Sequence, residues 1–140
     1  MPVVDASVVI DWIAPDVAEG SPAVRTLGRL HAEAAELLAP RLLREEVANA
    51  LLNGIRRGRW SGAAADDSYS MLGRLPVRFV DTASDLDRAW DLSRRYDDHP
   101  VYDMVYVALA ERMRTTFITA DDSLRSRLKQ LAWVVPPDPA

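Results

Sequence analysis

The sequence contains no cysteine, only two histidines and a single lysine, Lys129. Without cysteine, the chain has no disulfide, no thiol nucleophile and no cysteine-ligated zinc or iron–sulfur centre. The histidines, His31 and His99, are too far apart for the HExxH pattern of zinc hydrolases. No apolar run approaches the about 18 residues that span a membrane, and the first residues do not resemble a secretion signal. We therefore expect a cytoplasmic protein that does not contact membranes.

Length and charge limit the classes of protein further. The chain has 140 residues, of which 49% are hydrophobic, and a formal net charge of -4. We expect a single domain over residues 1–140, with residues 136–140 as a flexible tail. Domains that bind nucleic acid through general electrostatic attraction are usually basic, and the net charge of this chain argues against that mode of binding. However, binding of one or two divalent cations by clustered acids would leave the remaining surface close to neutral.

Short apolar runs alternate with helical patterns along the whole chain. This alternation predicts an α/β fold with a mostly parallel sheet. The strands are expected at residues 2–4, 37–39, 77–80, 116–119 and 133–135. The helices are expected at residues 7–14, 22–37, 40–57, 61–72, 84–96, 101–113 and 121–131.

Acids follow two of the predicted strands, at the position where such folds place their active sites. Asp5 ends the first apolar run and precedes Ser7, which we expect to cap the next helix. Asp121 and Asp122 follow the strand near residue 118 in the same way. The carboxyl ends of parallel strands are the usual ligand-binding edge. The alternative is that Asp121 or Asp122 only caps the following helix. One of the two acids could also cap while the other binds metal.

Two further acids lie on predicted helices. Asp103 lies in the first turn of an almost wholly apolar helix, where an acid without a partner would be costly, so a metal or an arginine is expected nearby. On the helix after residue 40, Glu46 falls on the shoulder of the apolar stripe, whereas Glu45 faces solvent. Asn49 lies one turn beyond Glu46 and could hold it. An ordinary surface glutamate is the alternative for Glu46.

Convergence of these acids would require a cation or the protonation of some of them. Two carboxylates about 4 Å apart repel by roughly 4 kcal/mol at an effective dielectric constant of about 20. Oxygen ligands without histidine or cysteine favour Mg²⁺ or Mn²⁺. Such an ion activates water and stabilises charge on a phosphodiester.

His99, in contrast, follows Asp97 and Asp98 and precedes Pro100 in a turn-like stretch, which favours a solvated loop over a catalytic base.

Four segments in order, residues 3–7, 42–51, 101–110 and 117–121, resemble the signature blocks of PIN-domain ribonucleases. Their order and spacing most resemble the VapC-type toxins of bacterial toxin–antitoxin pairs. The resemblance covers essentially the whole chain and implies a three-layer α/β/α, Rossmann-like domain with a Mg²⁺- or Mn²⁺-dependent endoribonuclease site. It also implies a homodimer that is inhibited by a small antitoxin protein covering the acidic groove. The implied metal-binding and catalytic residues are Asp5, Glu46, Asp103 and Asp121, with Asp122 as the alternative ligand and with Ser7, Asn49 and Thr119 in support.

Other families with acids at strand ends fit less well. A haloacid-type phosphatase needs a second aspartate two residues after the first, where this chain has Ser7. A phospho-receiver domain needs a lysine late in the sheet, but Lys129 lies in a predicted helix. The remaining alternative is a catalytically silent PIN-like domain that binds RNA or acts as a scaffold.

Overall fold

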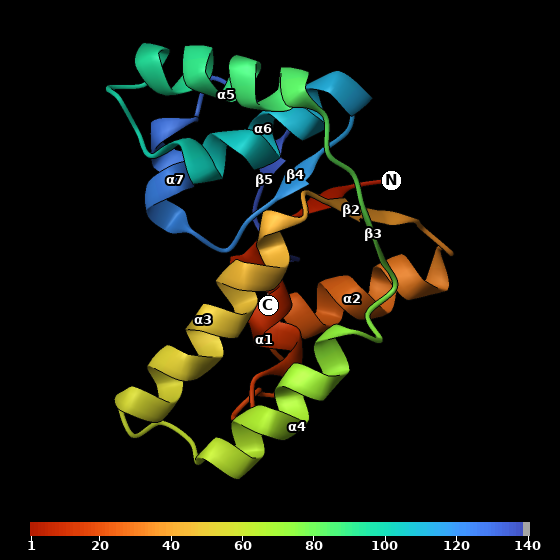
Figure 1. Ribbon diagram of the computed structural model, residues 1–140. Helices are drawn as coiled ribbons and strands as arrows, with labels where there is room; N and C mark the ends of the chain where they lie inside the picture. The colour runs from red at the N-terminus through yellow and green to blue at the C-terminus, as the bar shows by residue number, and fades with distance from the viewer. Residues whose placement is uncertain (139–140) are drawn as a thin grey trace.

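The computed structural model describes residues 1–138 and is built around one five-stranded sheet (Figure 1). The strand order is β3-β2-β1-β4-β5, and all neighbouring strands are parallel. The register pairs Val3 of β1 with Leu38 of β2 and with Phe117 of β4. The strands are β1 (Val3–Val4), β2 (Leu37–Ala39), β3 (Val77–Phe79), β4 (Phe117–Ile118) and β5 (Val134–Val135).

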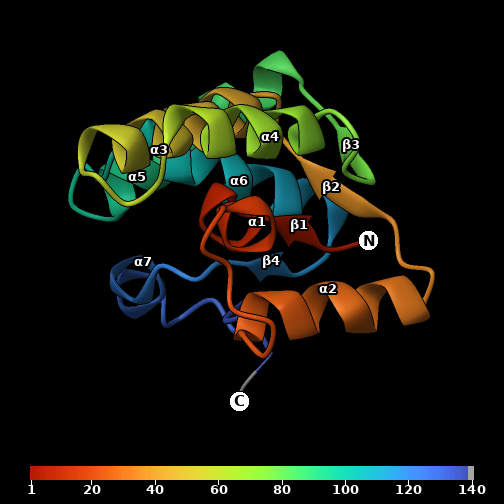
Figure 2. The same cartoon turned by 90° about the horizontal axis from the view of Figure 1, so that it is seen from below.

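Helices connect these strands and cover the sheet on both sides. Figure 2 shows α2 and α6 on opposite sides of β1 and β4, and in Figure 1 the α3–α4 pair projects away from the α5–α6 pair. The expected α/β fold with a parallel sheet is therefore confirmed. The helices are α1 (Ala6–Ile13), α2 (Pro22–Ala32), α3 (Leu42–Arg56), α4 (Gly62–Leu72), α5 (Ala83–Arg95), α6 (Val101–Met113) and α7 (Asp122–Arg127).

The central strands and α6 form the core, as their composition predicts. Val3, Val4 and Phe117 have no exposed surface, because helices cover both faces of the parallel sheet. Helix α6 packs against β1, β4 and α5, which explains why it is apolar nearly all round. No helix among residues 1–138 combines the length and the apolar character that crossing a bilayer requires.

Two helices are shorter than their sequence patterns predict. Helix α2 ends at Ala32 instead of near residue 37, because Ala34 adopts a left-handed φ of 52° that turns the chain toward β2. Helix α7 ends at Arg127 instead of residue 131. Leu128 beyond it is fully buried, so it reaches the core from a turn and not from a further helical turn.

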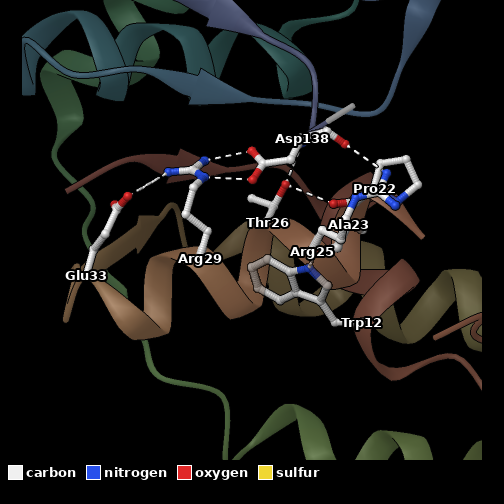
Figure 3. Close-up of polar contacts among 8 residues, drawn as sticks. All are labelled: Trp12, Pro22, Ala23, Arg25, Thr26, Arg29, Glu33 and Asp138. Carbon is white, nitrogen blue, oxygen red and sulfur yellow. Dashed lines mark hydrogen bonds and ion pairs between the residues drawn. The ribbon is translucent and has the colours of Figure 1, made fainter. Parts of the chain in front are cut away.

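The segment after β5 contacts α2 (Figure 3). Arg29 donates two hydrogen bonds to the Asp138 carboxylate, at 2.7 and 2.8 Å, and the Asp138 backbone N–H donates to Thr26 Oγ1 at 2.7 Å. The Arg29 guanidinium lowers the pKa of Asp138. Asp138 belongs to the expected flexible tail at residues 136–140, of which residues 139 and 140 lie outside the described residues.

Candidate acidic active site

The site is built on β1 and β4, which are neighbours in the sheet. Asp5 follows β1 directly and occupies the N-cap position of α1, yet its side chain caps no backbone N–H of that helix. Its carboxylate is therefore directed elsewhere, although the residue is only 6% exposed. The expectation that Ser7 caps this helix is wrong, because Ser7 lies inside α1 and contacts Asp5.

Two hydroxyl groups orient the Asp5 carboxylate. Thr119 Oγ1 donates to Asp5 Oδ2 at 2.6 Å, and Ser7 Oγ donates to the same oxygen at 2.8 Å. Each hydroxyl oxygen also accepts a backbone N–H from the turn after β4: that of Asp121 for Thr119, and that of Ala120 for Ser7. Because the N–H groups are donors and the carboxylate oxygen of Asp5 is the acceptor, the hydroxyl protons point toward Asp5. The carboxylate is thus held in one orientation at the junction of two strands.

The described partners of the Asp5 carboxylate are hydroxyl groups, and no cationic side chain pairs with it within residues 1–138. Burial raises the pKa of the Asp5 carboxyl, and the charge of Asp103 raises it further. The hydrogen bonds from Thr119 and Ser7 lower this pKa, but they do not outweigh burial. A hard cation at this position would stabilise the ionised form.

Glu46 and Asp103 come from α3 and α6 and act on Asp5 electrostatically. Burial raises the pKa of Glu46 to about 7, and the charges of Asp5 and Asp103 contribute to this shift. Tyr106 donates a hydrogen bond to Glu46 Oε1 at 2.6 Å. The neighbouring Glu45 is exposed, as the helical phase predicts. The fold therefore brings Asp5, Glu46 and Asp103 within electrostatic range of one another.

Asp121 has a different environment from the other three predicted acids. Its Oδ1 accepts the Leu124 backbone N–H at 3.0 Å, so Asp121 is the N-cap of α7. Asp122 has a side chain that is 91% exposed and pairs with Arg125. Of the two adjacent acids, Asp121 is therefore the capping residue and also the one whose backbone joins the Thr119 network.

Two residues at the site do not follow from the sequence pattern. His99 lies in the predicted loop, but its side chain is not solvated: it is 15% exposed, and Nε2 lies 2.6 Å from Asp103 Oδ2. Tyr106 is fully buried. A buried tyrosine needs a hydrogen-bond partner, so its position three residues after Asp103 on an apolar helix was a usable signal. Asn49, in contrast, is exposed and makes no hydrogen bond to Glu46 in the described part of the chain.

The donor set fits a hard cation in its chemistry. All predicted ligands are carboxylates, and the pKa values of Asp5 and Glu46 are raised first by burial and then by neighbouring negative charge, both of which a bound cation would offset. Within residues 1–138, however, no three histidine or acidic side chains are close enough to ligate one ion together. The acids are instead engaged with protein partners: Glu46 with Tyr106, Asp103 with His99, and Asp5 with two hydroxyls. Binding of an ion therefore requires these carboxylates to move closer together, and at Glu46 the oxygen left for the ion is Oε2, because Oε1 accepts the Tyr106 hydroxyl.

The raised pKa of Glu46 predicts a pH-dependent stability for the metal-free protein. Between the ordinary value of 4.5 and about 7, the folded protein binds a proton at Glu46 that the unfolded chain has released. The free energy of unfolding should therefore fall as pH rises through this window. Thermal unfolding between pH 4.5 and 8 measures this slope. Glu46→Gln should flatten it and Glu45→Gln should not; equal slopes in all three proteins would contradict the assignment.

Comparisons with known proteins agree with this architecture. A family model described as the PIN domain matches residues 3–129. Among solved structures, the chain is similar to VapC20 of Mycobacterium tuberculosis, described as a toxin that cleaves the sarcin–ricin loop. The sequence identity is 19% and the TM-score 0.65, over 96% of this chain and 97% of the other. This likeness concerns the fold. The comparison with curated proteins found no match.

Proposed function

The chain belongs to the PIN-domain family, and from this membership we propose that it is a Mg²⁺- or Mn²⁺-dependent endoribonuclease. The observation that carries the proposal is the buried Asp5 carboxylate, which lies within electrostatic range of Glu46 and Asp103 and whose pKa is raised first by burial and then by the charge of Asp103. Clustered acids that have no arginine or lysine partner are costly in a protein that does not bind metal. We further propose that the protein is a VapC-type toxin acting in the cytoplasm.

We assign the metal to Asp5, Glu46, Asp103 and Asp121. When bound, the ion would supply Lewis-acid activation of a water molecule and of a phosphodiester oxygen. Ser7 and Thr119 hold the Asp5 carboxylate in one orientation, so little reorganisation is needed there. Asn49 remains a predicted supporting residue on the exposed face of α3, one turn beyond Glu46.

RNA also needs cationic contacts, because the acids themselves repel phosphates. A surface hollow between the end of α5 and α7 is lined by Arg95, Arg127, Ser123 and Ser126, beside the segment that carries His99. The Arg127–Asp97 ion pair in this hollow is long, at 3.4 Å, and Asp97 is 91% exposed. A phosphate would readily replace that carboxylate. We propose this hollow as the route of the RNA strand away from the acids.

Protein partners follow from the same charge argument. The proposed antitoxin places a basic segment over the acids. This segment would neutralise the same negative charge that the metal ion neutralises. Antitoxin and Mn²⁺ should therefore compete.

We also propose a homodimer. In cells, expression of the chain alone should arrest growth, and co-expression of the short reading frame beside its gene should relieve the arrest.

The experiment that tests the activity uses purified protein without antitoxin. The substrates are total cellular RNA and a synthetic sarcin–ricin loop, each with Mn²⁺ or with EDTA. We expect cleavage with Mn²⁺ only. Protein that retains RNA on a filter but cuts neither substrate would instead support the silent RNA-binding alternative.

A pair of variants tests which of the two adjacent acids binds metal. Asp121→Asn keeps an N-cap side chain for α7 but removes the charge, so we expect cleavage to fall by roughly 100-fold at unchanged stability. Asp122→Asn should leave cleavage within about twofold, because its carboxylate is exposed to water. Cleavage rates with Mn²⁺ and thermal unfolding give both values. The reverse order would assign the metal to Asp122.

A further inference from the structure

Tyr106 connects the core of the fold to one of the proposed metal ligands. It lies on α6, three residues after Asp103, and has no exposed surface. Its hydroxyl donates to Glu46 Oε1 at 2.6 Å, across 60 residues of sequence. Tyr106 therefore packs in the core with its ring and contacts a proposed metal ligand with its hydroxyl group.

The ring of Tyr106 is held in place by packing. It stacks on the Phe117 ring with centroids 5.6 Å apart and an interplanar angle of 23°. Phe117 belongs to β4, which pairs with β1 directly before Asp5. A tyrosine hydroxyl is protonated at neutral pH, and this one donates its proton to Glu46 Oε1. Tyr106 is therefore a permanent donor at a defined position.

Glu46 needs such a donor to remain at the site. Its side chain has three rotatable bonds and is partly exposed, and the negative charges of Asp5 and Asp103 repel it. In the absence of the hydrogen bond, both repulsion and hydration would favour rotamers that point to solvent. The hydrogen bond from the Tyr106 hydroxyl keeps the Glu46 carboxylate from turning toward solvent.

We propose that Tyr106 is a positioning residue that keeps the Glu46 carboxylate directed toward Asp5 and Asp103 and thereby sets the affinity for the divalent cation. This inference rests on the proposed metal-dependent function. Groups that hydrogen-bond to a metal ligand and orient it typically contribute about 10- to 100-fold to metal affinity. The competing explanation is that Tyr106 only fills the core and that its hydroxyl merely finds an acceptor.

A double-mutant cycle separates these explanations. Mn²⁺ binding is measured by electron paramagnetic resonance for the wild type, Tyr106→Phe, Glu46→Gln and the double variant. We expect Tyr106→Phe to weaken Mn²⁺ binding by at least about tenfold in the wild-type background. In the Glu46→Gln background the same change should have less than about a twofold effect, because the carboxylate that Tyr106 positions is absent. A purely structural role predicts the same effect in both backgrounds and would overturn the proposal.

A matched control and a second measurement complete the test. Tyr102→Phe removes a hydroxyl from the same helix at a side chain that is 64% exposed, and it should leave Mn²⁺ binding unchanged. If Tyr106→Phe does not fold, the hydroxyl proton of Tyr106 is followed by NMR in the wild type. Its resonance should shift during a Mg²⁺ titration with the midpoint of binding, and an unmoved resonance would contradict the proposal. A wild type that binds no Mn²⁺ would overturn the proposed function, whereas equal binding by wild type and Tyr106→Phe would overturn only the role of Tyr106.

Discussion

Asp5→Asn is expected to abolish RNA cleavage while leaving the fold intact. The amide has the shape of the carboxylate and still accepts the hydroxyl protons of Ser7 and Thr119, but it carries no charge for a cation. Loss of several kcal/mol of transition-state stabilisation corresponds to roughly a 1,000-fold slower reaction. The measurement is the rate of RNA cleavage with saturating Mn²⁺.

Stability distinguishes this effect from misfolding. Because burial raises the pKa of Asp5, its ionised form destabilises the metal-free protein, and removing the charge should leave the unfolding temperature equal or higher. Asp67→Asn, on the exposed surface of α4, is the matched control and should change neither rate nor stability. Rapid cleavage by well-folded Asp5→Asn protein would remove Asp5 from the site.

Arg112→Met is expected to have the largest effect on stability. Arg112 donates to both oxygens of Asp85, at 2.8 and 2.9 Å, and joins α6 to α5. The Asp85 side chain is 6% exposed, so loss of the guanidinium leaves a buried charge without a partner. We expect a loss of about 3 kcal/mol, or an unfolding temperature lower by roughly 10 °C. Thermal and urea unfolding measure the change.

The same helix pair offers a matched control. Arg88 and Glu111 form a similar two-bond ion pair, at 2.7 and 3.0 Å, but the Glu111 side chain is 39% exposed. Arg88→Met should therefore cost less than about 1 kcal/mol. Adding Asp85→Asn to Arg112→Met should recover part of the stability, because no buried charge remains. Equal losses for Arg88→Met and Arg112→Met would show that burial of the acid does not decide the effect.

Much of the fold could be predicted from local sequence. The alternation of apolar strands and helices predicts the parallel sheet, and the residue range of α6 agrees with its pattern. The ends of α2 and α7 could not be predicted. Ala34 takes a left-handed conformation without glycine, and Leu128 reaches the core from a turn, because the path of the chain toward the next strand determines both.

The candidate site divides in the same way. Helical phase distinguishes Glu46 from Glu45, and strand ends indicate Asp5 and Asp121. The partners of these acids come from distant segments: Thr119 contacts Asp5 across 114 residues, and Tyr106 contacts Glu46 across 60. Local periodicity contains no information on such pairs. The turn-like composition before Pro100 even suggested the wrong environment for His99, because it does not reveal that Asp103 lies within hydrogen-bond reach.

By itself, the sequence determined the fold class, the acidic character of the site and the order of the acids along the chain, because these depend on residue type and spacing. The tertiary structure alone decided which groups surround each acid: two oriented hydroxyls at Asp5, a permanent donor at Glu46, an imidazole at Asp103 and a helix cap at Asp121. It also determined which charges lack compensation. Burial and the relative positions of β1, α3 and α6 set the pKa values of Asp5 and Glu46, and only packing of the whole chain fixes those positions.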